Sequence, residues 1–116
     1  MNKRILGTNM ETLAAEFLKK SGVRIIMRNY RCPFGEIDLI LKEQNTLVFA
    51  EVKYRSNTRL GSPEESVNPR KQLKIIQASK FYIMEYHVSS FTAIRYDVIA
   101  IDQHEIRWLR GAFGSM

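Results

Sequence analysis

The sequence predicts an α/β fold in which a mixed sheet of about five strands carries helices on its faces. Apolar residues recur at helical spacing over residues 10–20 and again after Pro69. Other runs are rich in β-branched and aromatic residues, as strands are. The resulting order is helix, three strands, helix, two strands. With 116 residues, the chain is expected to form a single domain over residues 1–116.

The first predicted helix covers residues 10–20. Its apolar residues lie at positions 10, 13, 14, 17 and 18, which is the stripe of an amphipathic helix. Thr8 or Asn9 can cap its start, and Gly22 supplies a stop after the last periodic residue.

Three strands are expected to follow. Residues 23–27 form a short β-branched run, and the basic stretch 28–33 after it is expected to be irregular. Residues 35–43 and 46–55 have the pattern of two strands, and the polar pair Gln44-Asn45 between them favours a tight reversal.

The second half of the chain predicts a loop and a helix. Residues 56–67 lack apolar periodicity and are expected to be a loop, a candidate flap over a substrate. Asn68 as cap and Pro69 at the first helical position predict a helix that runs to about Tyr86. This helix is expected to bury four apolar residues or their neighbours: Leu73, Ile76, Phe81 and Met84.

Two more strands are predicted at residues 93–101 and 105–109, joined by a turn. The tail from residue 111 to 116 is expected to be loose, with Phe113 packing back on the fold.

Composition excludes several kinds of protein. Cys32 is the only cysteine, so an internal disulfide and a thiolate zinc cluster are excluded, and the two histidines lack metal-ligand spacing. No run of about 18 apolar residues is present, so no membrane association is expected. The basic N-terminus does not lead into an apolar secretion segment, which predicts a cytoplasmic location.

The net charge of +6 is unevenly distributed. Residues 1–35 and residues 53–80 each hold seven basic and two acidic side chains. Phosphate backbones, and DNA in particular, are the expected partner of two such segments. Taken alone, this charge distribution fits solvated surfaces on a mildly basic protein equally well.

Three charged residues on the predicted hairpin carry the strongest chemical signal. If the reversal at Gln44-Asn45 is a two-residue loop, Asp38 lies directly opposite Glu51, and strand alternation places Lys53 on the same face as Glu51. Facing like charges repel, and a divalent cation such as Mg²⁺ or Mn²⁺ would offset the repulsion. Both carboxylates adjoin apolar runs, where a charge calls for a reason.

A resemblance to a known family rests on these residues and their surroundings. The segments Gly35–Ile40, Phe49–Arg55 and Arg95–Ile99, with Gly61 and Lys71, resemble the YraN family over nearly the whole chain. These small bacterial proteins belong to the PD-(D/E)xK nuclease superfamily and are related in fold to archaeal Holliday-junction resolvases. The resemblance implies a restriction-endonuclease-like core.

The resemblance also implies roles for individual residues. Asp38 and Glu51 match the metal-binding carboxylates, and Lys53 matches the catalytic lysine. The carbonyl of Val52 is a candidate extra oxygen ligand. The expected cofactor is therefore Mg²⁺ or Mn²⁺.

Further acids are candidates for supporting roles. In resolvases a glutamate on the first helix, four residues after a glycine, approaches the metal, and Gly7 to Glu11 has that spacing. Glu11 is therefore the candidate third acid, although Met10 stands where many family members carry a second glycine; Glu16 is the fallback. Glu36 faces the predicted catalytic lysine in the same register, and it fits a structural ion pair as well as a role at the metal.

The expected function is metal-dependent hydrolysis of phosphodiester bonds in DNA, including branched or structured DNA. The candidate nucleic-acid contacts are Arg55, Arg70, Lys71 and Lys74, although the two lysines fit solvent-facing positions equally well. The alternative is a nucleic-acid-binding module with the same fold and no turnover. A protein-interaction subunit ranks last, and a homodimer through an exposed sheet edge is a further expectation.

Overall fold

The structure is a computed structural model that describes residues 3–55 and 67–114, with side chains from residue 9 onward. Helices and strands follow one another in the predicted order. Their bounds are α1 Lys3–Lys20, β1 Arg24–Cys32, β2 Gly35–Glu43, β3 Thr46–Tyr54, α2 Pro69–Glu85, β4 Ala93–Ile101 and β5 Ile106–Phe113.

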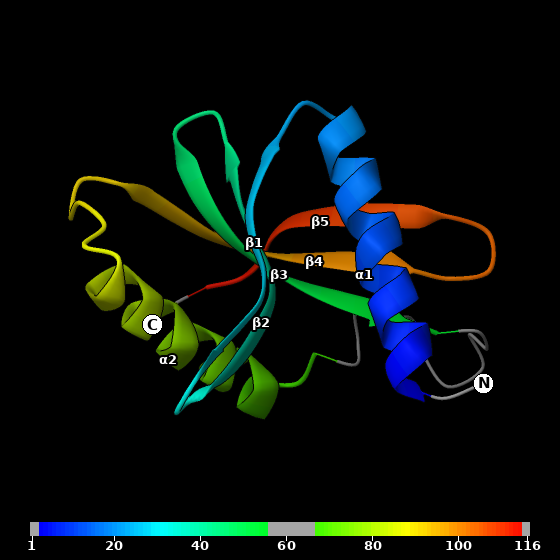
Figure 1. Cartoon of the computed structure of the whole chain (residues 1–116), viewed down its shortest axis with the longest axis horizontal. Coiled ribbons are helices and arrows are strands. Elements are labelled where there is room, and N and C mark those ends of the chain that lie inside the picture. The colour runs from blue at the N-terminus through cyan, green and yellow to red at the C-terminus, as the bar shows by residue number, and fades with distance from the viewer. Residues whose placement is uncertain (1–2, 56–66, 115–116) are drawn as a thin grey trace.

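The strands form one mixed sheet in the order β1-β2-β3-β4-β5. Neighbouring strands are antiparallel except β3 and β4, which run parallel and are connected through α2. A parallel pair needs such a crossover because the chain must return to the edge where the first strand began. The two helices lie on different sides of the sheet (Figure 1). The predicted α/β class with a mixed sheet is confirmed, and the arrangement is consistent with a restriction-endonuclease-like fold.

Strand β3 shows how the two faces of the sheet are covered. Val48 and Ala50 pack in the cluster that α1 covers, whereas Leu47 and Phe49 pack in the cluster that α2 covers. All four side chains are buried. A strand covered on both faces has a nearly continuous apolar sequence, which explains the run before Glu51.

Helix α1 begins earlier than predicted. It starts at Lys3, so Thr8 and Asn9 lie inside the helix rather than at its cap. Their helix propensity is only about 0.7 kcal/mol per residue or less below that of alanine, which a continuing helix tolerates. The predicted stop is confirmed: Gly22 has a φ of 89°, its N–H donates to the Lys19 carbonyl, and the next N–H donates to the Leu18 carbonyl.

Strand β1 is longer than predicted. It runs through the stretch 28–33, expected to be irregular, as far as Cys32, which faces Gly35 across a two-residue turn. Gly35 has a φ of 149°, a backbone conformation that favours glycine. The alternation signal was weak because β1 is an edge strand with several exposed polar side chains.

Helix α2 begins as predicted, and its predicted core face is confirmed in part, because Ile76 is buried and Phe81 packs against the core cluster. The Oδ1 of Asn68 accepts a hydrogen bond from the Lys71 N–H at 2.9 Å, which confirms the cap. Leu73 and Met84, expected in the core, are 55% and 63% exposed. The buried residues are Ile75, Ile76, Ala78, Ser79 and Tyr82. The small side chains among them let the helix approach the sheet, where the hydroxyls of Ser79 and Tyr96 are hydrogen-bonded at 2.7 Å.

Strand β5 continues beyond the predicted end at Leu109 as far as Phe113. The ring of Phe113 stacks on that of Tyr96, with centroids 5.3 Å apart, so it packs back as expected. The tail is therefore part of the sheet up to this residue, rather than loose.

The predicted loop at residues 56–67 lies outside the described residues, except for Val67, which is buried in the cluster under α2. The idea of a flap over a substrate stays a prediction. Within the described part of the chain, neither helix is long and apolar enough to cross a membrane.

A fully buried carboxylate joins β4 to β5. Asp97 accepts two hydrogen bonds from Arg95, one from the Trp108 indole at 2.8 Å and one from the Gly111 N–H at 2.9 Å. Arg95 also reaches Glu43 at the end of β2, at 2.7 Å. The network fastens the last strand to the sheet through side chains as well as through the backbone.

This network predicts a large stability loss for Asp97→Asn. The substitution removes the charge that pairs with Arg95, and breaking a buried pair costs about 3 kcal/mol or more. Urea unfolding of both proteins would measure the difference. The control is Glu105→Gln. Glu105 forms an ion pair with Arg107 near the surface, so its loss should change the free energy of unfolding by about 1 kcal/mol or less. Equal losses in the two variants would contradict the assignment.

Candidate active site

The predicted register of the β2–β3 hairpin is confirmed. Glu43 faces Thr46 and Leu39 faces Ala50, with Gln44 in the turn at a φ of 54°. Asp38 and Glu51 are the next positions along this register, one step beyond the last paired residues. The backbone ladder therefore ends where the two acids begin.

The carboxylate of Asp38 replaces the missing backbone partner. Its Oδ2 accepts a hydrogen bond from the Val52 N–H at 2.9 Å. Because the N–H and C=O of one strand residue point to the same edge, the Val52 carbonyl faces the same gap. The role of this main-chain oxygen as an extra ligand stays a prediction.

The other neighbour of β2 is also interrupted at Asp38. Arg28 pairs with Leu39 and Tyr30 pairs with Ile37, but Asn29, between them, has a φ of 54° and no ladder partner. Asparagine is among the few residues that adopt this left-handed conformation readily. Both ladders of β2 therefore open at Asp38.

Glu51 lies buried between two ammonium groups. Only 3% of the residue is exposed. Its Oε1 lies 3.4 Å from the Lys53 Nζ and 3.7 Å from the Lys71 Nζ. Lys53 reaches it by strand alternation, and Lys71 reaches it because the Asn68 cap fixes the first turn of α2.

Burial and mutual repulsion keep a proton on this acid pair. Burial is the main cause that raises the pKa of Glu51, the Asp38 charge adds to it, and the two lysines oppose it, which leaves the pKa at about 8. Burial also raises the pKa of Asp38, against the stabilising Val52 N–H. The interaction between the two carboxyl groups raises the pKa of Glu51 further and lowers that of Asp38. With a pKa of about 8, Glu51 can hold a proton at neutral pH, and a divalent cation could replace it.

Glu11 approaches the pair from α1. Burial and the charge of Asp38 raise its pKa, whereas a hydrogen bond from Asn29 and the charge of Arg28 lower it. The Oε1 of Glu11 and the Oε2 of Glu51 are buried and accept no hydrogen bond from the described residues. Buried acid oxygens without donors are suited to a cation.

The donor set fits Mg²⁺ through two carboxylates rather than three. Among the described residues, no group of three His, Cys, Asp or Glu side chains is close enough to hold a metal. Mg²⁺ is usually bound by one or two carboxylates and completes its shell with water and phosphate oxygens. Asp38, Glu51 and the Val52 carbonyl meet that requirement. Glu11 as a direct third ligand stays a prediction.

Two other predicted acids have different surroundings from those expected, although the charge of Glu36 still acts on Asp38 and Glu11. Glu36 forms an ion pair with Arg31 at 3.1 Å, so the expected pairing with Lys53 is wrong. The pairing fails because the ladder between β2 and β3 does not extend past Leu39. Glu16 is exposed on α1.

The predicted basic contacts are divided between two elements. Arg70 and Lys74 are exposed on α2, on either side of Lys71 in the sequence. Arg55 follows β3, and its N–H donates to the Ile101 carbonyl. Sequence reasoning did not include Asn29, which lies in the stretch 28–33 that was expected to be irregular.

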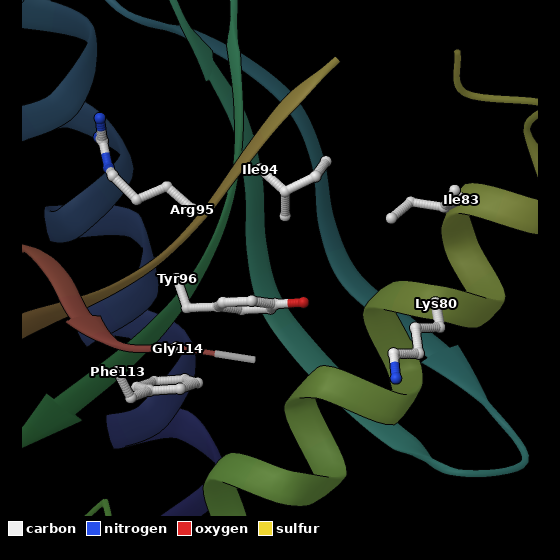
Figure 2. A pocket seen from close by; sticks show the side chains of 7 residues that line it. All are labelled: Lys80, Ile83, Ile94, Arg95, Tyr96, Phe113 and Gly114. Atoms are coloured by element: carbon white, nitrogen blue, oxygen red, sulfur yellow. The ribbon is translucent and has the colours of Figure 1, made fainter. Parts of the chain in front are cut away.

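A separate recess of about 390 Å³ lies between α2, the start of β4 and the end of β5. Figure 2 shows the parallel rings of Tyr96 and Phe113, with the Arg95 guanidinium pointing away from them. None of the candidate acids lines this recess. The guanidinium of Arg95 donates hydrogen bonds to Asp97 and Glu43, so this side chain is not available to a ligand in the recess.

Comparison with known proteins identifies the family. Residues 10–101 match the model of "Uncharacterised protein family UPF0102". The chain belongs to the UPF0102 family. This is the family of YraN, so the resemblance noted from the sequence is confirmed.

UPF0102 relatives from different bacteria match almost the whole chain. A UPF0102 protein of Lachnoclostridium phytofermentans is 42% identical over 99% of this chain and 98% of its own length. UPF0102 protein lpg2994 of Legionella pneumophila is 43% identical over 94% of each chain. UPF0102 protein VV0603 of Vibrio vulnificus is 41% identical over 96% of this chain and 93% of its own. The family description names no activity.

The raised pKa of Glu51 predicts that the metal-free protein loses stability as the pH rises. The folded state holds this proton more tightly than the unfolded state, so the stabilisation is full below pH 4.5 and disappears as the pH passes about 8. Glu51→Gln should lack this loss and exceed the wild type by about 1 kcal/mol or more above that pH. Thermal unfolding in EDTA across the range would measure it, with Glu36→Gln as control. Parallel curves of stability against pH for the wild type and Glu51→Gln would show that Glu51 does not hold a proton in the folded state.

Proposed function

We propose that this UPF0102 protein is a Mg²⁺- or Mn²⁺-dependent endonuclease that hydrolyses phosphodiester bonds in DNA. The observation that carries the proposal is the facing pair of half-buried Asp38 and buried Glu51, with two lysine ammonium groups beside Glu51. Such a pair is costly for folding alone, because burial and repulsion both oppose its ionisation. Groups of this kind concentrate at functional sites.

Each residue of the site has a task in this proposal. Asp38, Glu51 and the Val52 carbonyl would hold the cation, which supplies charge neutralisation and a more acidic water. Lys53, with its Nζ at 3.4 Å from Glu51, would stabilise charge on the phosphate or orient the attacking water. Lys71 would bind a second phosphate oxygen from the start of α2.

DNA is the proposed substrate because of the charge around the acids. The protein carries a net charge of +6, and the basic residues of α2 begin beside Glu51. Lys71, Arg70 and Lys74 could hold the phosphates on either side of the cleaved bond. Branched or otherwise structured DNA is the class to test first, in line with the likeness to resolvases.

A second candidate function is a nucleic-acid-binding module without turnover. The ammonium groups of Lys53 and Lys71 lie near Glu51, and its pKa of about 8 lets it hold a proton, so either the lysines or that proton can balance its charge without a metal. Among the residues that the structure describes, no third acid completes a preformed metal group. These observations favour the second candidate over a protein-interaction subunit.

Self-association through a sheet edge is part of the proposal for double-strand cleavage. In the described part of the sheet, β1 and β5 each have a strand neighbour on one side. An edge strand can pair with the same strand of a second copy around a twofold axis.

The first test of the proposal is cleavage by variants. Asp38→Asn and Lys53→Ala should lower the rate at least about 100-fold, because each removes a group that acts on the phosphate or its nucleophile. Rates would be measured with Mg²⁺ and Mn²⁺ on single-stranded, duplex, flapped and four-way DNA. Glu16→Gln, at an exposed position on α1, is the matched control that should keep the wild-type rate. The same rate in wild type and both site variants would show that any cleavage comes from a contaminant.

The second test is metal binding without substrate. Calorimetry with Mn²⁺ should show binding that is lost in Asp38→Asn and in Glu51→Gln. Because the cation displaces the proton of Glu51, the affinity should rise as the pH approaches about 8, with proton release into the buffer. Binding that is absent from the wild type would favour the module without turnover.

A further inference from the structure

An apolar recess of about 410 Å³ opens on the outer side of α2. Its walls come from the turn between β1 and β2 and from α2, and they consist of Phe34, Gln77, Lys80, Phe81 and Met84. The rings of Phe34 and Phe81 lie 6.0 Å apart at 60°, and Phe34 is 50% exposed. The volume falls within the range of about 300 to 1,000 Å³ that is typical of ligand sites.

The recess is the far end of a ridge along α2. Exposed or half-buried residues recur every three or four positions from Arg70 to Met84, on the side away from the buried residues of α2, and Phe81 at the border of this side also packs against the core cluster. The ridge combines basic, polar and apolar side chains. They are Arg70, Leu73, Lys74, Gln77, Lys80, Phe81 and Met84.

The charge of α2 is almost all of one sign. The helix holds four basic residues and one acidic residue, Glu85. That acid accepts a hydrogen bond from the Tyr30 hydroxyl at 2.8 Å. The ridge therefore presents positive charge together with aromatic surface, which is the combination that binds single-stranded nucleic acid.

The ridge is continuous with the candidate active site. Lys71, beside Arg70, lies 3.7 Å from Glu51. One turn later Lys74 packs against Gly35, where an added Cβ would lie 3.7 Å from the lysine Cβ. Phe34 precedes that glycine. Lys71 and Lys80 are separated by about 14 Å of helix, at 1.5 Å per residue.

We propose that the recess between Phe34 and Phe81 holds an unstacked base of single-stranded DNA whose backbone follows the basic ridge to the acid pair. This inference rests on the proposed function and names its substrate class, which is DNA with an unpaired segment beside the cleaved bond, such as a flap or an opened junction. A base that is unpaired and unstacked exposes a face that can lie on an aromatic ring, whereas neighbouring bases cover the faces of bases within a duplex. Lysine charge alone would bind duplex and single strand without that distinction.

The test measures binding in EDTA, so that no cleavage occurs. Fluorescence anisotropy would compare a labelled oligothymidine of about 12 nucleotides, within the usual range of binding-site sizes, with an abasic strand of equal length and with a duplex. The wild type should bind the oligothymidine more tightly than the abasic strand. Phe34→Leu and Phe81→Leu should each weaken oligothymidine binding at least about fivefold and leave the other two ligands unchanged.

The matched control is Phe91→Leu. Phe91 is 97% exposed in the turn before β4 and does not line the recess, so its loss should leave all three affinities unchanged. Thermal unfolding would show that each variant folds. Phe34 lies in an exposed turn, so Phe34→Leu removes an aromatic ring outside the core.

Equal affinity of the wild type for oligothymidine and abasic strand would overturn the inference, as would unchanged binding in both ring variants. Self-association of the wild type that disappears in these variants, with DNA binding intact, would overturn it in favour of a contact between copies. The outcome is separate from that of the proposed function. Base-dependent binding without any cleavage would support the recess and reject the nuclease, and cleavage without a base effect would do the reverse.

Discussion

The facing of Asp38 and Glu51 across the β2–β3 hairpin is the constraint on which the candidate site depends. One step before these residues the backbone ladder is intact, and at Asp38 it opens on both sides of β2. The opening leaves a buried gap bordered by two carboxylates and a main-chain carbonyl. Without the two-residue turn at Gln44, the two acids would not share one gap.

The rest of the fold holds charge around that gap. Helix α2 is needed to connect two parallel strands, and its capped first turn brings Lys71 to Glu51. Helix α1 covers the other face and places Glu11 near Asp38. At the other end of the sheet, Asp97 and Glu43 use their charges to hold strands together. The protein thus contains satisfied acids that serve the fold and unsatisfied acids that are suited to a ligand.

Local signals predicted much of this arrangement. The polar pair Gln44-Asn45 was sufficient to place Asp38 opposite Glu51, and Asn68-Pro69 marked the start of α2. The core face of α2 was predicted only in part: Ile76 is buried, whereas Leu73 and Met84 are exposed, because the helix has apolar residues on both sides and only the sheet decides which side is buried. The predicted partner of Glu36 failed for a related reason: a register cannot be extended through a ladder that ends. Asn29 depends on a left-handed backbone that no apolar pattern reports.

The position of Glu51 between two ammonium groups has a consequence for the order in which ligands assemble. As long as this carboxylate is free, it competes with any incoming anion for Lys53 and Lys71. A cation that occupies the carboxylate removes that competition and leaves both amines available to the anion. Metal and phosphate would therefore bind with positive cooperativity. A bound metal removes the competition of Glu51 for the two lysines, and a bound phosphate removes the competition of the lysines for Glu51.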